Sequence, residues 1–347
     1  MTTMSAWVLR GHGDAALEDV PVPEPGPGEV RIRVHAAALN RHDVLSRQGI
    51  TGPGIRERRY PHVCGSDGAG VVDRLGEGAG GVSVGDTVAV YPGIGCGACD
   101  WCRAGREPLC RGYGSWSEGP WGSLADYAIA PARNLRVLPP ETDLVNVAAG
   151  TVAFTTAWHL LVTLGRVRVG EAVLVVGAGG GVALAALTLA MRAGASVYAT
   201  SGQDWKVARV EELGAAAANH HAVAYDEWIH QRTGGRGADV VFDSNGAATW
   251  RRSIRSLAPG GRMLVCGATT GDVPEISIRE LYQKQGQILG SPIGGRADFD
   301  EVVPQLASGE LRPVIHAVHP LADIAHAMDE IDSGRQFGKV VLRTDAG

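Results

Sequence analysis

Apolar residues recur along the first 150 residues in short β-branched or alternating runs, separated by glycine and proline. Such runs predict β-strands, because branched side chains suit a pleated surface and the breakers mark turns. The runs are VRIRVHAAAL (30–39), AGVVDRL (69–75), DTVAVYP (86–92) and SLADYAIAP (123–131). The N-terminal part of the chain is therefore predicted to be β-rich.

Near residue 150 the pattern changes. EAVLVVG (171–177) is a continuous apolar run, as expected for a strand buried on both faces of a parallel sheet. Helical patterns, one of them at 204–215, alternate with further runs. These runs are ASVYAT (195–200), ADVVFD (238–243), GRMLVCG (261–267) and GQILGS (286–291). Regular strand–helix alternation predicts a doubly wound α/β domain.

Beyond this domain the pattern predicts helices at about 298–308 and 321–333, then a last strand, FGKVVLR (337–343). That strand lies outside the α/β repeat, so we expect the chain to return to its first domain. The prediction is an α/β protein of two domains, which a length of 347 residues favours. Their expected boundaries are 1–150 with 293–347, and 151–292.

Composition and charge limit the classes of partner that we expect for this protein. Hydrophobic residues make up 45% and charged residues 20%, which is typical of a globular protein, and the 49 glycines fall in short clusters between apolar runs. Net charge is −5 and no basic block stands out, so neither nucleic acid nor a membrane is an expected partner. Because we find no signal-like start and no stretch of about 18 apolar residues, we expect a cytoplasmic protein.

Four of the six cysteines follow the spacing C-x2-C-x2-C-x7-C. Closely spaced thiolates on a glycine-containing loop can surround a zinc ion, and four of them leave no position for substrate, so the site should be structural. The four predicted ligands are Cys96, Cys99, Cys102 and Cys110. Reduced surface thiols and an iron–sulfur cluster are the alternatives. Cys64 and Cys266 stand alone and are interpreted as small buried hydrophobic residues.

A glycine-rich turn, VLVVGAGGGVALAAL, follows the buried strand and opens a helix. Such a turn lets backbone N–H groups and a helix N-terminus approach a pyrophosphate. Its residues are Gly177, Gly179, Gly180, Gly181 and Val182. Val182 departs from the strict G-x-G-x-x-G pattern, but the strand–turn–helix context is the one this motif needs. A turn without a ligand is the alternative.

The end of the next strand bears on the choice of dinucleotide. NAD sites usually place Asp or Glu there to accept the ribose hydroxyls. This chain has Thr200, Ser201 and Gly202 instead, with Lys206 one helical turn later. No carboxylate would repel a 2′-phosphate and a cation is near, so we predict NADP(H). Alternatively, Lys206 is a solvated helix residue.

These features together resemble the medium-chain dehydrogenase/reductase superfamily, over essentially the whole chain. The likeness is closest to alcohol dehydrogenase-like and quinone oxidoreductase-like members that carry a zinc lobe. The motifs that carry it are AAALNRHDVL, GSDGAGVV, PARNL, TAWHLL, CGATTG and QFGKVVL. The resemblance implies a GroES-like catalytic domain with a structural zinc lobe at 93–112, a Rossmann domain, and cofactor between them. It also implies homodimers or homotetramers formed through the strand around GQILGS.

The resemblance further implies which residues contact the cofactor. Thr156 should lie near the nicotinamide, Lys339 should approach a phosphate, and Ser201 falls where NAD-preferring relatives carry an aspartate. The carboxamide side should be lined by Cys266, Gly267 and Ala268. The adenosine should be flanked by Ser244 and Asn245.

The chain departs from zinc-dependent alcohol dehydrogenases at the ligands of their second, catalytic zinc. It has Asn40 in place of a cysteine, Ser66-Asp67 in place of His-Glu, and no ligand around Thr151 to Ala153. Amide and hydroxyl oxygens bind zinc poorly beside thiolate and imidazole. We therefore predict one structural zinc per chain and no catalytic zinc. A rearranged site of Cys64, His42 and Asp67 is the alternative.

Without a Lewis acid, reduction of an activated C=C bond or a quinone by NADPH is more reasonable than alcohol oxidation. Asn40 is a candidate donor to the substrate oxygen or the cofactor, and His42 is a candidate proton donor. His42 could instead face solvent or bond a ribose hydroxyl. Asp67 is expected to make a supporting hydrogen bond.

Trp116 and Trp121 lie after the zinc lobe, where relatives border the substrate mouth. They favour a small, conjugated or aromatic substrate, or else they pack the lobe. Two other functions stay open. One is a carbonyl/alcohol oxidoreductase, and the other is a non-catalytic NADPH-binding protein.

Overall fold

The structure is a computed structural model that describes residues 2–49 and 59–344. The chain divides into two compact units, which we describe separately. Unit 1 comprises Met1–Val152 and Gly295–Gly347, and unit 2 comprises Ala153–Gly294. Each boundary lies two residues beyond the position expected from the sequence, because the division falls inside helix α3 (Leu144–Trp158) and just before helix α9 (Arg296–Ala307).

Unit 1 is built mainly of β-strands. Its larger strands are β1 (Thr3–Gly11), β2 (Asp14–Pro21), β3 (Glu29–Ala38), β5 (Asp67–Leu75), β6 (Thr87–Val90), β9 (Tyr127–Pro131), β17 (Ile315–Pro320) and β18 (Lys339–Arg343). Its shorter strands are β4 (His62–Val63), β7 (Gly93–Ile94), β8 (Gly114–Ser115) and β10 (Leu135–Val137). Its remaining helices are α1 (Arg41–Arg47), α2 (Asp100–Arg103) and α10 (Ile324–Asp332).

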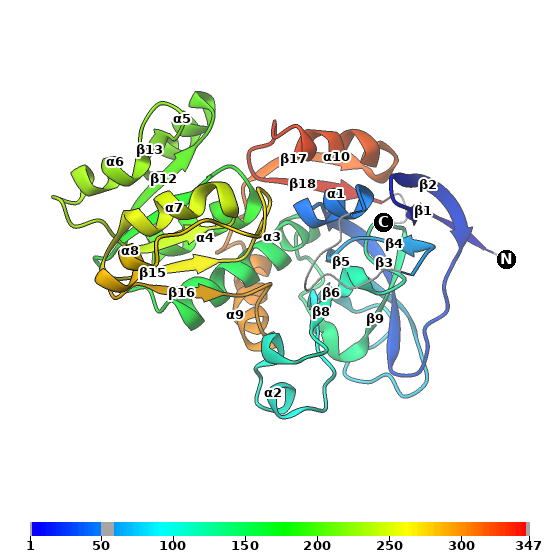
Figure 1. Ribbon diagram of the computed structural model, residues 1–347. Helices are drawn as coiled ribbons and strands as arrows, with labels where there is room; N and C mark the ends of the chain where they lie inside the picture. Colours follow the sequence, from blue (N-terminus) through cyan, green and yellow to red (C-terminus); the bar gives the residue numbers. More distant parts are fainter. Residues whose placement is uncertain (1, 50–58, 345–347) are drawn as a thin grey trace. The chain divides into compact units, whose positions relative to one another are not determined.

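The main sheet of unit 1 joins the two ends of the chain. Among the residues described, its order is β10-β6-β5-β3-β18-β17, with β9 also paired to β3. The C-terminal strand β18 runs antiparallel to β3, so the last strand does return to the first domain (Figure 1). Alternate residues of β3 are buried, as its alternating pattern predicts, and they enter a core of valine, leucine and isoleucine.

Unit 2 contains the α/β repeat. Its strands are β11 (Ala172–Val176), β12 (Ser196–Ser201), β13 (Ala216–Asn219), β14 (Ala238–Asp243), β15 (Leu257–Val265) and β16 (Gln287–Gly290). Its helices after α3 are α4 (Gly181–Arg192), α5 (Asp204–Glu212), α6 (Tyr225–Arg232), α7 (Ala247–Ser256) and α8 (Ile278–Gln283). A π-helical stretch, His159–Leu164, continues α3.

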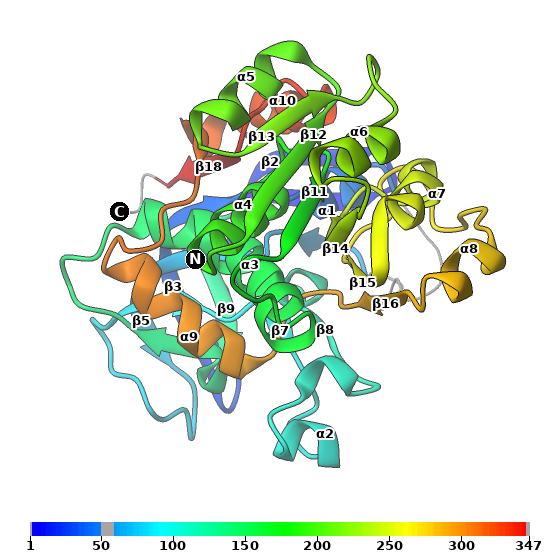
Figure 2. The ribbon, with the colours of Figure 1, turned by 90° about the vertical axis from the view of Figure 1, so that its left-hand side faces the viewer.

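The sheet of unit 2, which the structure describes in full, is entirely parallel with the order β13-β12-β11-β14-β15-β16 (Figure 2). The central strand β11 is buried at every residue, which explains its unbroken apolar sequence. From β11 the chain adds strands in one direction, to β12 and β13, and then returns to add β14, β15 and β16 on the other side of β11. Open α/β sheets bind ligands at the point where the strand order changes direction in this way. The fold class predicted from the sequence is confirmed.

The structure decides three local features that the sequence placed differently or left open. Strand β13 has the sequence AAAN, which lacks branched residues, and it exists because it pairs with β12. Strand β9 begins at Tyr127 rather than 123, because the preceding residues bond elsewhere; the amide of Leu124, for example, donates to the carbonyl of Cys64 at 2.9 Å. Trp116 is 2% exposed in the core of unit 1, and its Nε1 donates to the Ile129 carbonyl at 2.8 Å. Trp116 therefore packs the interior and does not offer a surface to substrate.

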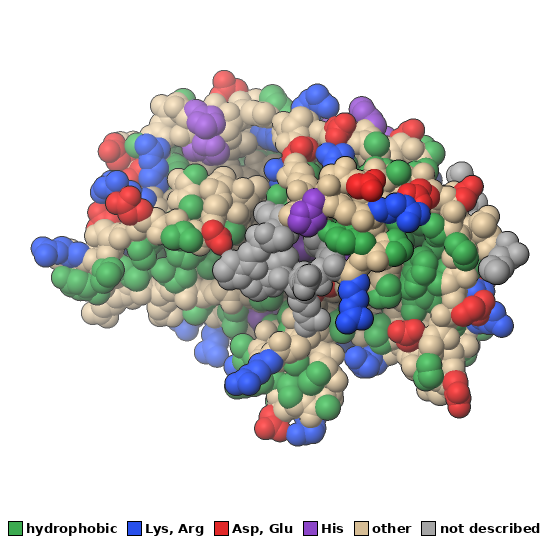
Figure 3. Space-filling view, turned by 45° about the vertical axis from the view of Figure 1, so that its right-hand side comes forward, with side chains coloured by type: hydrophobic (Ala, Val, Ile, Leu, Met, Phe, Trp, Pro, Cys, Tyr) green, Lys and Arg blue, Asp and Glu red, His purple; other side chains and the backbone are tan. Residues whose placement is uncertain are grey.

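One helical stretch in the described part of the chain, Leu144–Leu164, has the length and hydropathy of a membrane span, with a mean hydropathy of 1.5. This stretch is not an unbroken apolar run, because it contains Asn146, Thr155 and His159. Its most apolar window is 72% buried inside the protein, which is the pattern of a core helix. On the face in Figure 3, acidic and basic side chains are interspersed, in keeping with the small net charge.

Candidate functional site

The four predicted zinc ligands come together in unit 1, in the lobe between β7 and β8. Their sulfur atoms all lie within 4.8 Å of one another, and Cys96 Sγ lies 3.9 Å from Cys102 Sγ. A tetrahedral zinc with Zn–S bonds of about 2.3 Å places its sulfurs about 3.8 Å apart. The donor set and its spacing therefore fit one zinc ion with all four positions filled by protein.

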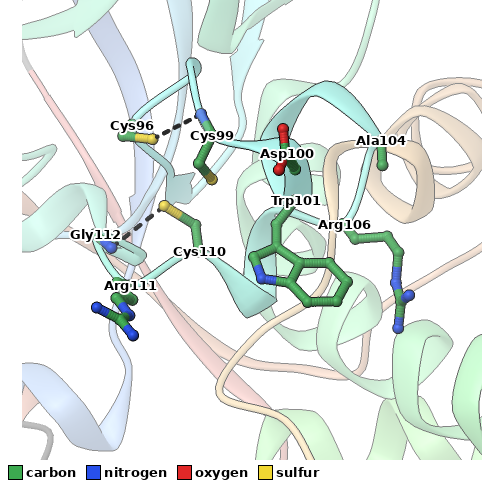
Figure 4. Close-up of a pocket in the computed structure, with 9 residues that line it drawn as sticks. All are labelled: Cys96, Cys99, Asp100, Trp101, Ala104, Arg106, Cys110, Arg111 and Gly112. Atoms are coloured by element: carbon green, nitrogen blue, oxygen red, sulfur yellow. Dashed lines mark hydrogen bonds between the residues drawn. The ribbon is translucent and has the colours of Figure 1, made fainter.

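Backbone N–H groups of the lobe donate hydrogen bonds to two of these sulfurs. The amide of Cys99 donates to Cys96 Sγ at 3.4 Å, and the amide of Gly112 donates to Cys110 Sγ at 3.3 Å (Figure 4). Hydrogen bonds from the backbone of Ala98 and Cys99 lower the pKa of Cys96 to about 6. A thiolate is the form that binds metal, so these amides favour binding.

A second group of predicted residues meets at Asp67, also in unit 1. The Asp67 carboxylate is fully buried and Lys339 is 4% exposed, and Lys339 Nζ lies 2.8 Å from Asp67 Oδ2. The other oxygen, Oδ1, accepts from the Thr151 hydroxyl and from the amide of Val152 at 2.6 Å. We call Asp67, Lys339, Asn40 and Thr151 the Asp67 centre.

Asn40 bridges the ion pair of the Asp67 centre. Its Oδ1 accepts from Lys339 Nζ at 2.7 Å, and its Nδ2 donates to Asp67 Oδ2 at 2.9 Å and to the Ala38 carbonyl at 3.4 Å. Both hydrogens of the amide therefore have acceptors within unit 1. In this geometry Asn40 holds the ion pair together, which is a different role from the predicted donor to a substrate oxygen.

The other predicted catalytic residues take distinct places. Asp67 accepts hydrogen bonds on both oxygens, in keeping with its expected supporting role. His42 is the second residue of α1 and is half-buried, and its carbonyl accepts from Ser46 Oγ at 2.6 Å. Lys339 commits two of its three N–H donors to the Asp67 centre, so a cofactor phosphate would have to use the third.

In unit 2 the predicted glycine turn joins β11 to α4. Gly177 has a φ of 77°, a conformation that favours glycine, and a Cβ there would lie 2.5 Å from Asn245 Oδ1. Gly180 is the N-cap of α4, and a Cβ there would meet nothing within 4 Å. The turn is thus a bare backbone cradle at a helix N-terminus, which fits a dinucleotide pyrophosphate.

The end of β12 lies against this turn. Gly177 N donates to Thr200 Oγ1 at 3.1 Å, and a Cβ built at Gly179 would lie 3.4 Å from Lys206 Nζ. Lys206 is 8% exposed, and burial lowers the pKa of its ammonium. Lys206 is therefore packed against the glycine turn and is not a solvated helix residue. Ser201 is buried beside it and ends β12.

The remaining predicted cofactor residues lie mostly at the carboxyl ends of the neighbouring strands of unit 2. Asn245 follows β14, and its Nδ2 donates to the Val176 carbonyl at 2.8 Å, beside Gly177. Gly267 follows β15, where a Cβ would lie 2.3 Å from the Ser244 carbonyl oxygen. Cys266 and Ala268 flank Gly267, and burial raises the pKa of the Cys266 thiol to about 12. Thr156 is buried in α3.

Sequence reasoning missed three parts of these sites. Thr151 and the Lys339–Asp67 ion pair carry no local motif, since their partners are far apart in the chain. His220 and His221, directly after β13, lie at the end of β12 because the two strands are neighbours. The double histidine in the sequence was the available signal for this last group.

Comparison with known proteins agrees with the fold. Residues 26–140 match the alcohol dehydrogenase GroES-like domain family and residues 181–308 match the zinc-binding dehydrogenase family. The human quinone oxidoreductase is 29% identical over 332 residues, covering 93% of this chain and 92% of that protein.

Two solved structures are similar over nearly the whole chain. An NAD-dependent alcohol dehydrogenase is 38% identical with a TM-score of 0.90, covering 98% of this chain and 99% of that one. The 2-octenoyl-CoA carboxylase reductase CinF, solved with NADP and 2-octenoyl-CoA, is 26% identical with a TM-score of 0.91, covering 99% of this chain and 88% of that one. The chain belongs to the medium-chain dehydrogenase/reductase superfamily of oxidoreductases.

Proposed function

We propose that this protein is an NADPH-dependent reductase of an activated C=C bond or a quinone, and that it works without a catalytic zinc. The observation that carries the proposal is the Asp67 centre. At the positions where zinc-dependent relatives hold their catalytic metal, this chain has Asn40, Ser66 and Thr151. Asp67, which follows Ser66, bonds to Asn40, Thr151 and Lys339.

The charges of the Asp67 centre disfavour a divalent ion. A zinc bound to Asp67 would face the buried Lys339 ammonium, 2.8 Å from the carboxylate, and would leave that cation without its partner. In the described part of the chain, the four lobe cysteines are the single group of three or more His, Cys, Asp or Glu side chains placed to share a metal. The donor set thus supports one structural zinc per chain.

The choice of NADP(H) rests on unit 2. Lys206 packs on Gly179, and Thr200, Ser201 and Gly202 stand where an acidic residue would repel a 2′-phosphate. Two relatives have names that agree with this proposal. CinF is a reductase whose solved structure holds NADP, and the human relative is a quinone oxidoreductase.

When bound, NADPH supplies a hydride to the β-carbon of an enone or enal. The electron pair of the C=C bond would then form a double bond between the α-carbon and the carbonyl carbon, while the carbonyl π pair moves to the oxygen. A proton at the α-carbon would restore the carbonyl and complete the reduction. We assign the proton to His42, because imidazole is a common general acid in proteins and His42 is half-buried at the start of α1. Lys339 and Asp67 hold the Asn40 side chain, and the backbone N–H of Asn40 donates to Asp43 Oδ2 at 2.8 Å, so Asn40 connects the Asp67 centre to the start of α1.

The direct test is NADPH consumption, followed by its ultraviolet absorbance, over a broad panel of enones, enals and quinones. Turnover of such substrates with one zinc per chain by elemental analysis is the expected result. The alternative is a carbonyl/alcohol oxidoreductase, which the similar NAD-dependent alcohol dehydrogenase favours. Two zinc ions per chain with alcohol oxidation would establish that alternative, and tight NADPH binding with no turnover would indicate a non-catalytic binding protein.

His42→Asn tests the assigned proton donor. We expect kcat to fall about 100-fold with little change in KM, because the proton transfer is lost while substrate contacts remain. His326→Asn is the matched control, since His326 is an exposed residue of α10. A kcat unchanged in His42→Asn would remove His42 from the mechanism.

We also propose that the protein works in the cytoplasm as a homodimer or homotetramer. Strand β16 lies at the edge of the unit 2 sheet and pairs on one side with β15. Val273, Ile278 and Tyr282, between β15 and β16, are 84%, 73% and 60% exposed, which favours a partner surface there. Light scattering after gel filtration would give the mass of the assembly, and the mass of a monomer would contradict the proposed homodimer or homotetramer.

A further inference from the structure

The end of β12 carries a histidine pair that the proposed reaction does not use. A Cβ built at Gly202 would lie 3.0 Å from His220 Nε2 and 2.9 Å from His221 Nε2. Both imidazoles therefore converge on the backbone directly after Ser201, and their ring centroids lie 4.6 Å apart.

The hydroxyl of Thr200 lies beside the ring of His220. Thr200 Oγ1 accepts from Gly177 N at 3.1 Å and lies 3.4 Å from His220 Nδ1. The other ring nitrogen, Nε2, lies 3.0 Å from a Cβ built at Gly202, in the segment where a dinucleotide's adenosine ribose is held in this fold. A protonated imidazole carries a hydrogen on both nitrogens, so the Nε2 of a protonated His220 is a donor at that segment.

The surroundings of this imidazole influence its charge. Burial first, and then the charges of His221 and Arg252 on α7, lower the pKa of His220 and so favour its neutral form before an anion binds. The other charged groups on the elements beside it are Lys206 and Asp204 on α5 and Asp226 on α6. Asp204 Oδ1 accepts from Asn219 Nδ2 at 2.6 Å, and Asp226 Oδ1 lies 3.8 Å from an Arg252 nitrogen, which offsets part of the Asp226 charge.

We propose that His220 binds the 2′-phosphate of the dinucleotide and takes up a proton when it does so, which makes the preference for NADP(H) over NAD(H) weaken as pH rises. A phosphate dianion beside Nε2 favours the imidazolium, since opposite charges stabilise each other in a partly buried site. The proton converts a neutral hydrogen bond into a charge-assisted one. Lys206 supplies a fixed positive charge, and His220 supplies one that depends on pH.

The sign of the pH effect follows from the change on binding. The phosphate raises the His220 pKa above its value in the free protein. The extra affinity is therefore fully present below the free pKa and is lost as pH rises through the pKa of the complex. NAD(H) lacks the 2′-phosphate and should show no such dependence. The proposal rests on the NADP(H) preference proposed above.

The experiment is calorimetric titration of the full-length protein with NADP⁺ and with NAD⁺ between about pH 6.5 and pH 8.5. This range begins above the second ionisation of the phosphate, near pH 6. Repeating each titration in two buffers of different ionisation enthalpy counts the protons taken up. We expect the ratio of NADP⁺ to NAD⁺ affinity to fall about tenfold across the range, with proton uptake for NADP⁺ alone.

Three variants separate the contributions. His220→Gln keeps a donor but cannot be protonated, so it should flatten the ratio and abolish the uptake. Lys206→Gln should weaken NADP⁺ binding at every pH while keeping the slope. His326→Gln, in unit 1, should match the wild type.

The outcomes distinguish the two proposals. If NADP⁺ binds more tightly than NAD⁺ but the ratio does not change with pH, or if His220→Gln keeps the wild-type slope, the role of His220 is overturned and the NADP(H) preference stands. If NADP⁺ binds no more tightly than NAD⁺ at any pH, the NADP(H) preference itself fails.

Discussion

The glycine turn and the Asp67 centre handle charge in opposite ways. The turn, in unit 2, consists of bare backbone at a helix N-terminus, with Lys206 packed on Gly179. The backbone N–H groups and the helix N-terminus give the turn a positive electrostatic potential, and the turn has no acidic side chain, so it suits an anionic ligand. The Asp67 centre, in unit 1, holds a carboxylate and an ammonium 2.8 Å apart, both buried and both hydrogen-bonded.

The contrast shows why the glycine turn suits a ligand while the Asp67 centre organises the protein. A buried charge must be compensated, and the Asp67 centre obtains its cation from Lys339, where a metalloenzyme would obtain it from a metal ion. Removing a member of this centre should therefore affect folding first. Substitutions in the glycine turn should strain its backbone and weaken dinucleotide binding.

The largest effect is expected from Lys339→Met. It leaves the Asp67 carboxylate buried without its cation, so the free energy of unfolding should fall by about 3–5 kcal/mol. Urea denaturation measures this. The double variant Asp67→Asn with Lys339→Met should recover part of the loss, because it removes the orphaned charge.

The control for that change is Arg47→Met, which breaks the exposed pair between Arg47 and Asp329 at 3.2 Å. Its cost should stay within about 1 kcal/mol. If Lys339→Met cost no more than this control, the description of the Asp67 centre as a compensated buried charge would be wrong.

An intermediate effect is expected from Gly177→Ala. The left-handed φ of 77° and the approach of Asn245 to 2.5 Å should together cost about 2 kcal/mol and weaken dinucleotide binding. Gly180→Ala, at a position with a φ of −89° and open space, should change stability by less than about 0.5 kcal/mol. Equal effects of the two substitutions on thermal stability would contradict this geometry.

The smallest effect is expected from Thr151→Val, which keeps the shape of the side chain but removes one donor to Asp67 Oδ1. A hydrogen bond to a buried charge contributes about 1.5 kcal/mol or more, and the free energy of unfolding should fall by that amount. The control is Thr142→Val, because the Thr142 hydroxyl donates to the Pro139 carbonyl on the surface. Urea denaturation of both variants would show whether Thr151→Val lowers the free energy of unfolding more than Thr142→Val, as expected.

Most of the architecture could be predicted, because it depends on local patterns. The buried strand β11, the alternation of strands and helices and the return of the last strand all followed from the periodicity of apolar residues. Strand β13 could not be predicted, since its alanines form a strand only by pairing with β12. The position of Trp116 was open for the same reason, because an isolated tryptophan does not reveal what it packs against.

The candidate sites divide in the same way. The sequence by itself determined the cysteine lobe and the glycine turn, because each lies within one short segment and needs residue types that few other structures demand. Only the tertiary structure decided the Asp67 centre, where Asn40 and Lys339 are separated by 299 positions, and the histidine pair at the end of β12. Common polar side chains acquire a role only from their neighbours, and strand pairing chooses those neighbours.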